Sequence, residues 1–145
     1  MKNVVELLKS LQADSTVMFM KLHNFHWNVK GMDFHPVHAK TEEMYDDFAD
    51  LLDDLAERVL QLGDKPLVSL ASILKSARIK EEEASSFTSK VIAEAVLKDY
   101  EFLVGEFKKL SKMADDAGDK VTAGFADEKV GAFEKSIWML KAQLG

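Results

Sequence analysis

Apolar residues recur along this chain at intervals of three and four, the spacing of one face of an α-helix. In the first segment, about residues 3 to 30, they form two neighbouring rows: Val4, Leu11, Met18 and Phe25, and beside them Leu8, Leu22 and Val29. A second segment carries Met44, Phe48, Leu51, Leu55 and Leu62. The pattern predicts a long helix that ends near Gly31. A second helix should follow, from Pro36, which suits a first helical position, to the break at Gly63 and Pro66.

The remaining apolar repeats predict one short and two long helices. The short repeat is Leu67, Leu70 and Leu74; the long ones are Val96, Tyr100, Leu103, Phe107 and Leu110, then, after a break at Gly118 and Asp119, Ala126, Val130, Phe133, Ile137 and Leu140. No segment alternates with the period of two that marks a strand. We therefore expect an all-α fold: a single domain over residues 1–145, built as a four-helix bundle with a short extra helix in the crossover between the second and third long helices.

The composition narrows the chemistry and the location of the protein. The net charge is −6, from 25 acidic and 19 basic residues, and no basic block stands apart from the acids, which argues against an electrostatic grip on nucleic acid or anionic lipid. Because there is no cysteine, any metal must bind to nitrogen and oxygen ligands. The sequence shows neither an export signal nor an apolar run long enough for a membrane span, so we expect a cytoplasmic protein.

All four histidines fall within residues 23 to 38, in HNFHWNVKGMDFHPVH. The second helix carries an acidic stripe, Glu42, Asp46, Asp50, Asp53 and Glu57, on one face. The last two form an i, i+4 pair in LLDDLAER that suits iron. For the first three we expect a solvated face or the lining of an inner surface rather than direct metal ligation.

His26 precedes and His38 follows the predicted turn, so the helical hairpin should bring both imidazoles to one end. Fifteen residues of helix, about 22 Å, separate His38 from Asp53, so one metal ion cannot join them within a chain. Two copies of this helix packed antiparallel about a twofold axis near residues 45–48 would place His38 opposite Asp53 and Glu57. We therefore expect a metal site shared between two chains. His23 and His35 are expected to serve as caps, packing groups or surface residues.

The stretch HNFHWNVKG, the following F-x-x-x-H, and DDLAERVLQLG resemble the Dps-type mini-ferritins, most closely the neutrophil-activating-protein branch, with support from GDKVT and KSIWMLKA. The resemblance implies a dodecameric shell with ferroxidase sites at twofold interfaces. It implies that His26, Asp53 and Glu57 hold a first iron, that Glu57 can bridge to a second, and that His38 approaches this second, weaker position. Trp27 resembles a tryptophan beside the site that donates or absorbs an electron; packing in the core is the alternative.

The expected function is oxidation of Fe(II) with hydrogen peroxide or dioxygen and storage of Fe(III), with zinc or copper as competing metals. The lysine-rich tail with which many such proteins bind DNA is not expected, so DNA binding should be weak or absent. Asp115, Asp119 and Asp127 would lie near an acidic threefold pore or serve as ordinary caps. The alternatives are a DNA-compacting protein, a surface protein that acts on host cells, and a plain helical adaptor.

Overall fold

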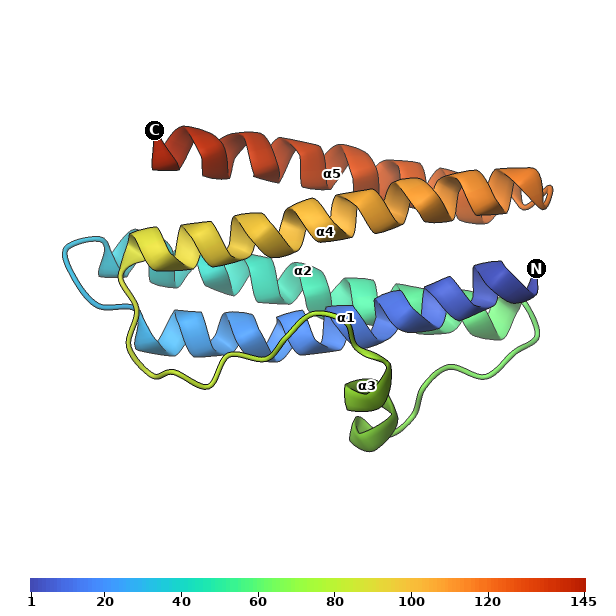
Figure 1. Cartoon of the computed structure of the whole chain (residues 1–145), viewed down its shortest axis with the longest axis horizontal. Coiled ribbons are helices and arrows are strands. Elements are labelled where there is room, and N and C mark those ends of the chain that lie inside the picture. Colours follow the sequence, from blue (N-terminus) through green and yellow to red (C-terminus); the bar gives the residue numbers. More distant parts are fainter. The chain divides into compact units, whose positions relative to one another are not determined.

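The computed structural model describes residues 1–145 and contains five helices and no strand (Figure 1). The long helices are α1 (Lys2–Asn28), α2 (Phe34–Gln61), α4 (Ser89–Asp116) and α5 (Lys120–Leu144), and the short α3 (Leu70–Ser76) lies in the connection between α2 and α4. The expected all-α class with a short extra helix in the crossover is confirmed. No helix is both long and apolar enough to cross a membrane.

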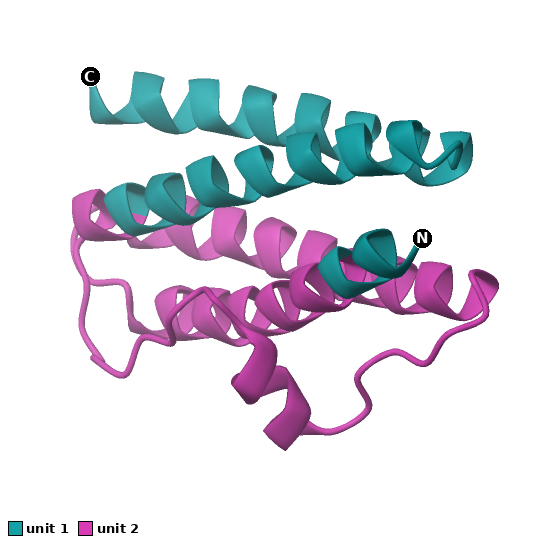
Figure 2. Cartoon of the chain, turned by 45° about the vertical axis from the view of Figure 1, so that its right-hand side comes forward, with its two compact units in different colours: residues 1–7, 93–145 teal, residues 8–92 magenta.

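The chain divides into two compact units (Figure 2). One unit consists of residues 8–92 and holds most of α1, all of α2 and α3, and the crossover. The other consists of residues 1–7 and 93–145 and holds α5 and most of α4.

In the unit of residues 8–92, α1 and α2 form an antiparallel hairpin (Figure 1). The predicted apolar rows of α1 are buried along their whole length, as are Met44, Phe48, Leu51 and Leu55 in α2. Gly31 in the connecting turn has a φ of +113°, a conformation that glycine adopts without the penalty of a Cβ atom. Helix α2 begins at Phe34, two residues before the predicted start.

The crossover is fastened to α1 by polar contacts. The Gln12 side chain donates to the Leu67 carbonyl at 2.8 Å and accepts from the Leu67 N–H at 3.0 Å. Further along, Lys30 N–H donates to the Phe87 carbonyl at 2.8 Å, and Phe87 N–H donates to the Asn28 carbonyl at 3.1 Å. Both ends of the crossover are thereby held against α1, which carries His23 and His26, and against the residues just after its end.

Helix α3 differs from the expectation in the side chains it buries. Ile73 is buried, whereas Leu70 and Leu74 of the predicted apolar repeat are 74% and 53% exposed. The spacing of the repeat located the helix, but the face that turns inward is the one that carries Ile73.

In the unit that holds α4 and α5, the predicted apolar row of α4 is buried, and Tyr100 meets Phe133 edge to face with ring centroids 5.0 Å apart. Helix α5 begins with Asp119 as its N-cap, and the Asp119 side chain accepts from Thr122 N–H at 3.1 Å. Asp115 pairs with Lys120, which lowers the pKa of that carboxyl, and Asp127 accepts from Ser111. The expectation of an ordinary cap is therefore confirmed for Asp119.

Candidate metal centre

The rings of His26 and His38 lie face to face at the end of the α1–α2 hairpin. Their centroids are 3.6 Å apart and their planes differ by 15°. Each Nδ1 lies within hydrogen-bond distance of the other residue's backbone carbonyl: His26 Nδ1 is 2.6 Å from the His38 oxygen, and His38 Nδ1 is 2.8 Å from the His26 oxygen. The hairpin thus brings the two imidazoles together as expected, and each residue's backbone orients the other's ring.

These reciprocal bonds determine which nitrogen is available to a metal. A carbonyl oxygen only accepts hydrogen bonds, so Nδ1 of each ring carries the proton and Nε2 carries the lone pair. A histidine whose Nδ1–H is held by a carbonyl is oriented for ligation through its other nitrogen. Both imidazoles are therefore oriented as Nε2 ligands.

The stacked arrangement also determines how many ions the two rings can serve. An imidazole binds a metal in the plane of its ring, about 2 Å from the nitrogen. With the planes only 15° from parallel, an ion in the plane of His26 lies roughly 3 Å from the plane of His38. The two rings cannot share one ion, and they suit two neighbouring ions instead.

Glu42 is a residue of this site that the sequence analysis assigned elsewhere. Its Oε1 lies 3.9 Å from Nε2 of His26. An ion about 2.1 Å from each of these atoms fits between them. The geometry therefore makes Glu42 a candidate ligand beside His26, and its position four residues after His38 on α2 is the signal that would have indicated it.

Asp53 and Glu57 lie on α2 and are exposed. By the rise of the helix both are more than 20 Å from His38, Asp53 about four turns and Glu57 about five turns away. No group of three His, Asp or Glu side chains that could hold a metal ion forms within the chain. The structure thus brings His26 and His38 together with Glu42 but does not bring Asp53 and Glu57 to them.

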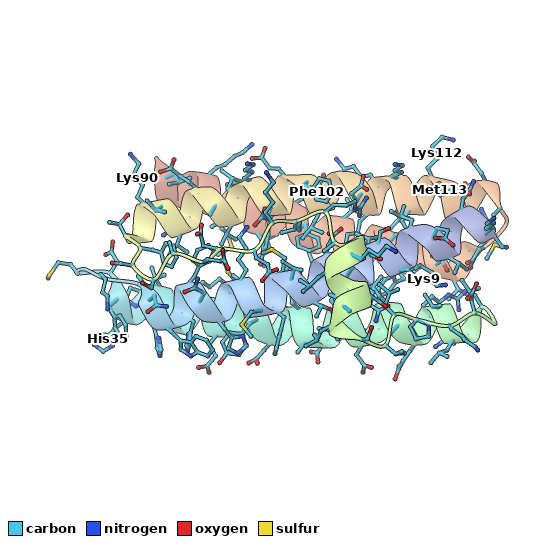
Figure 3. All side chains as sticks on the ribbon, turned by 60° about the horizontal axis from the view of Figure 1, so that its bottom comes forward. Lys9, His35, Lys90, Phe102, Lys112 and Met113 are labelled. Carbon is cyan, nitrogen blue, oxygen red and sulfur yellow. The ribbon has the colours of Figure 1, made fainter.

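The other aromatic residues at this end have distinct surroundings. His23 Nδ1 lies 2.7 Å from the Phe19 carbonyl, and the His23 ring stacks on Tyr45 at 3.7 Å, so His23 is a packing group. His35 is exposed at the α1–α2 turn (Figure 3). Both observations confirm the expectation for these two histidines. Trp27 is 58% exposed, so the alternative that it packs in the core of the chain is wrong.

Two features of α2 concern the twofold axis that the sequence placed near residues 45–48. Phe48 is only 2% exposed and belongs to the core of the chain, so it cannot supply the contact between chains that we expected there. Tyr45 is partly exposed, and withdrawal from water, followed by the charges of Glu42 and Asp46, raises its pKa. The phenol therefore stays protonated in the physiological range.

A groove of about 480 Å³ lies between α1, α3 and the crossover. Its apolar lining includes Met20, Trp27, Leu70 and Leu74, all more than half exposed. A contiguous apolar surface of this kind is typical of an interaction site. Trp27, which lines this groove, is next to His26 in the sequence.

Comparison with known proteins identifies the class to which this fold and site belong. The family model of the ferritin-like domain matches residues 5–145. The DNA protection during starvation protein of Helicobacter pylori is 57% identical over 139 residues, which cover 96% of each chain. The crystal structure of Helicobacter cinaedi CAIP shares 62% identity and superposes with a TM-score of 0.97 over 98% of this chain and 99% of that one.

The chain therefore belongs to the ferritin-like family. Within that family it belongs to the Dps proteins, which confirms the resemblance found in the sequence. A Dps protein from Vibrio cholerae, described as a member of a broad superfamily of ferritin-like diiron-carboxylate proteins, is 31% identical with a TM-score of 0.95 over 99% of this chain and 90% of that one. The expected ferritin-like bundle is confirmed by these matches, and membership supports a role in iron handling in general terms.

Proposed function

We propose that this protein is a ferroxidase and iron-storage protein whose catalytic sites form between two chains. The observation that carries the proposal is the pair of stacked imidazoles, each held through Nδ1 and each with Nε2 free for a separate ion. Dinuclear iron chemistry needs two adjacent positions, and nitrogen and carboxylate ligands suit Fe(II). Zinc and copper would bind the same donors and compete.

Two carboxylates from a second chain complete the ligand set. His26, with Glu42 beside it, and the partner's Asp53 and Glu57 hold the first Fe(II), and Glu57 reaches the second ion, which His38 approaches. Asp53 and Glu57 are exposed on α2 and therefore accessible to another chain. Antiparallel packing of two α2 helices about an axis between residues 46 and 47 places residue 38 opposite residue 55, midway between the two acids.

The reaction consumes two Fe(II) and one peroxide. Each Fe(II) gives up one electron, the oxygen–oxygen bond breaks, and two hydroxide ions and two Fe(III) result; dioxygen is the alternative oxidant. The chain's contribution is to hold both ions close to the oxidant. Trp27, which is exposed and next to His26 in the sequence, would supply the second electron when only one Fe(II) is bound. Fe(III) then moves to the carboxylates of the acidic stripe, among them Asp46 and Asp50.

The groove offers a further apolar surface for assembly. Leu70, Leu74, Met20 and Trp27 would lose their exposed area if a second chain covered the groove, and this burial would stabilise the assembly. We propose that such dimers build a dodecameric shell in the cytoplasm, in which residues 1–145 act as one domain.

Mixed assembly of two inactive variants tests whether the site is shared. His26→Ala/His38→Ala chains lack the imidazole half, and Asp53→Asn/Glu57→Gln chains lack the carboxylate half. In a mixed dimer one site collects all the defects and the other is intact, so random 1:1 assembly should restore about a quarter of the wild-type rate of Fe(II) oxidation. Mixtures that co-assemble, as shown by mass spectrometry, yet remain as inactive as their parents would contradict the proposal.

DNA protection is the competing function, because it appears in the name of the Helicobacter pylori relative. The net charge of −6 without a basic block favours weak or absent binding near neutral pH. A gel-shift titration at several salt concentrations distinguishes the two functions, since binding through phosphates weakens steeply with salt. Tight binding at physiological salt would favour the DNA-compacting alternative.

A further inference from the structure

We infer that Phe34 is a positioning residue that holds the His38 imidazole in the orientation required for the second, weaker iron position. The inference rests on the proposed function. The ring of Phe34 stacks on that of His38, with centroids 5.0 Å apart and planes 18° from parallel. His38 therefore lies between two rings, Phe34 on one face and His26 on the other.

The local sequence explains the contact. Phe34 is the first residue of α2 and His38 follows four residues later, so both side chains lie on the same face of the first helical turn. Phe34 is itself only partly exposed. The F-x-x-x-H spacing noted in the sequence thus corresponds to a physical contact between the two rings.

The two histidines differ in how much else holds them. His26 is 6% exposed and has two further neighbours, Thr41, whose Oγ1 lies 3.4 Å from Nδ1, and Tyr45, whose ring meets it edge to face at 5.3 Å. His38 is partly exposed, and its ring has one hydrogen bond, through Nδ1 to the His26 carbonyl. A single bond at one atom leaves the ring free to tilt away from His26, and the stack on Phe34 at the opposite face opposes that tilt.

Loss of the Phe34 ring should therefore weaken binding of the ion held by His38 and leave binding of the ion held by His26 almost unchanged. Stacked ring pairs contribute about 0.5–1.5 kcal/mol beyond burial, which corresponds to a decrease of roughly 2- to 13-fold in affinity for the second ion. The first binding event should change less than about twofold, because its ligands do not touch Phe34.

Anaerobic Fe(II) titration of the assembled protein by calorimetry measures the two events separately. Phe34→Leu keeps an apolar side chain and a good helix former but lacks the ring. Phe34→Tyr restores the ring and should restore the second event. His35→Ala is the control for a neighbouring aromatic side chain: the His35 ring meets the Phe34 ring edge to face, with centroids 5.4 Å apart, and its removal leaves the Phe34–His38 stack itself in place. His38→Ala and Asp53→Asn calibrate the second and first events, and thermal unfolding verifies that each variant is folded.

The outcomes distinguish this inference from the proposed function. Selective weakening of the second event in Phe34→Leu, with recovery in Phe34→Tyr, supports it. Two results would show that Phe34 does not position His38, although the proposed site would stand. In the first, His38→Ala abolishes the second binding event while Phe34→Leu leaves it intact. In the second, Phe34→Leu weakens both binding events equally. If neither His38→Ala nor Asp53→Asn alters Fe(II) binding, the proposed function itself fails.

Discussion

The carboxylate of Asp14 fastens the crossover to α1, and its replacement gives a quantitative test of this structure. Asp14 is fully buried and accepts four hydrogen bonds. Its Oδ1 accepts from the backbone N–H groups of Arg78 and Ile79 at 2.6 and 3.1 Å. Its Oδ2 accepts from the Arg78 guanidinium, through Nε at 3.1 Å and a terminal nitrogen at 2.7 Å. Asp14→Asn and Asp14→Ala therefore remove different parts of the same contact.

The expected costs follow from which bonds survive. Asparagine can keep both backbone bonds through its carbonyl oxygen but turns an NH₂ group toward the guanidinium, whereas alanine loses all four bonds. Breaking a buried ion pair by removing one partner costs about 3–5 kcal/mol. Because the Arg78 side chain is 33% exposed, we place Asp14→Asn at the lower end, about 3 kcal/mol, and Asp14→Ala above it.

Thermal unfolding followed by circular dichroism, at one fixed protein concentration, measures the difference. For a chain of this size 1 kcal/mol shifts Tm by about 2–4 °C, so Asp14→Asn should lower Tm by roughly 6–12 °C and Asp14→Ala by more. Asp64→Ala is the matched control, since it removes an exposed carboxylate paired with Lys9 at 3.1 Å and should have a much smaller effect. A decrease in Tm no larger than that of Asp64→Ala would refute the reasoning, as would an alanine variant more stable than the asparagine variant.

Three further predictions concern single residues. Phe48→Asp should unfold the chain itself, because the side chain is 2% exposed; circular dichroism that shows a folded monomer would instead make Phe48 an interface residue. Withdrawal from water raises the pKa of Asp47; the nearby Lys40 charge opposes the rise, and Asp50, Glu43 and Asp46 add to it, so the folded chain loses stability as pH rises through the folded pKa of this carboxyl. Asp47→Asn should accordingly raise Tm at pH 7 but not at about pH 2.5, below the ordinary pKa of 3.8, where the carboxyl is protonated in the folded and the unfolded chain alike; an equal gain at both pH values would exclude this cause. Asp119→Ala should cost about 1 kcal/mol in urea unfolding through loss of the α5 cap, and Asp119→Asn should restore most of it, which a purely electrostatic role would not allow.

The helices were predictable because their apolar residues repeat over many turns. The heptad rows of α1 and the apolar row of α4 predicted buried faces correctly at every position. Single residues were harder where one repeat is short or where two roles compete. The three leucines around α3 indicated a helix but not that Ile73 would be its buried residue. In the sequence, Phe48 was consistent both with a place in the core of the chain and with a contact at the twofold axis. Its burial in the structure shows that it belongs to the core.

The proximity of His26 and His38 was predictable from the hairpin, but the hydrogen bonds that orient their rings were not. Helical spacing places His26 and His38 at one end, yet it carries no information on the reciprocal bonds between their rings and backbones. Those bonds depend on how α1 and α2 approach each other across the turn. The same holds for Glu42, which the sequence presents as one of several acids on a stripe and which only the approach of α1 brings to His26.

Under the proposed function, the balance between the charges of the iron ions and of their ligands explains why the site needs two chains. Two Fe(II) ions bring four positive charges to a site where one chain supplies two neutral imidazoles and a single carboxylate, that of Glu42. The partner's Asp53 and Glu57 add two negative charges and reduce the excess from three to one, so tight binding at both positions requires the dimer. Oxidation then adds two positive charges to the iron and forms two hydroxide ions; once the hydroxide ions leave the site the excess is again three, which favours departure of Fe(III) toward nearby acids. Asp46 and Asp50 continue the same face of α2 and are exposed. The acidic stripe thereby receives Fe(III), whose positive charge the ligands of the completed site no longer balance.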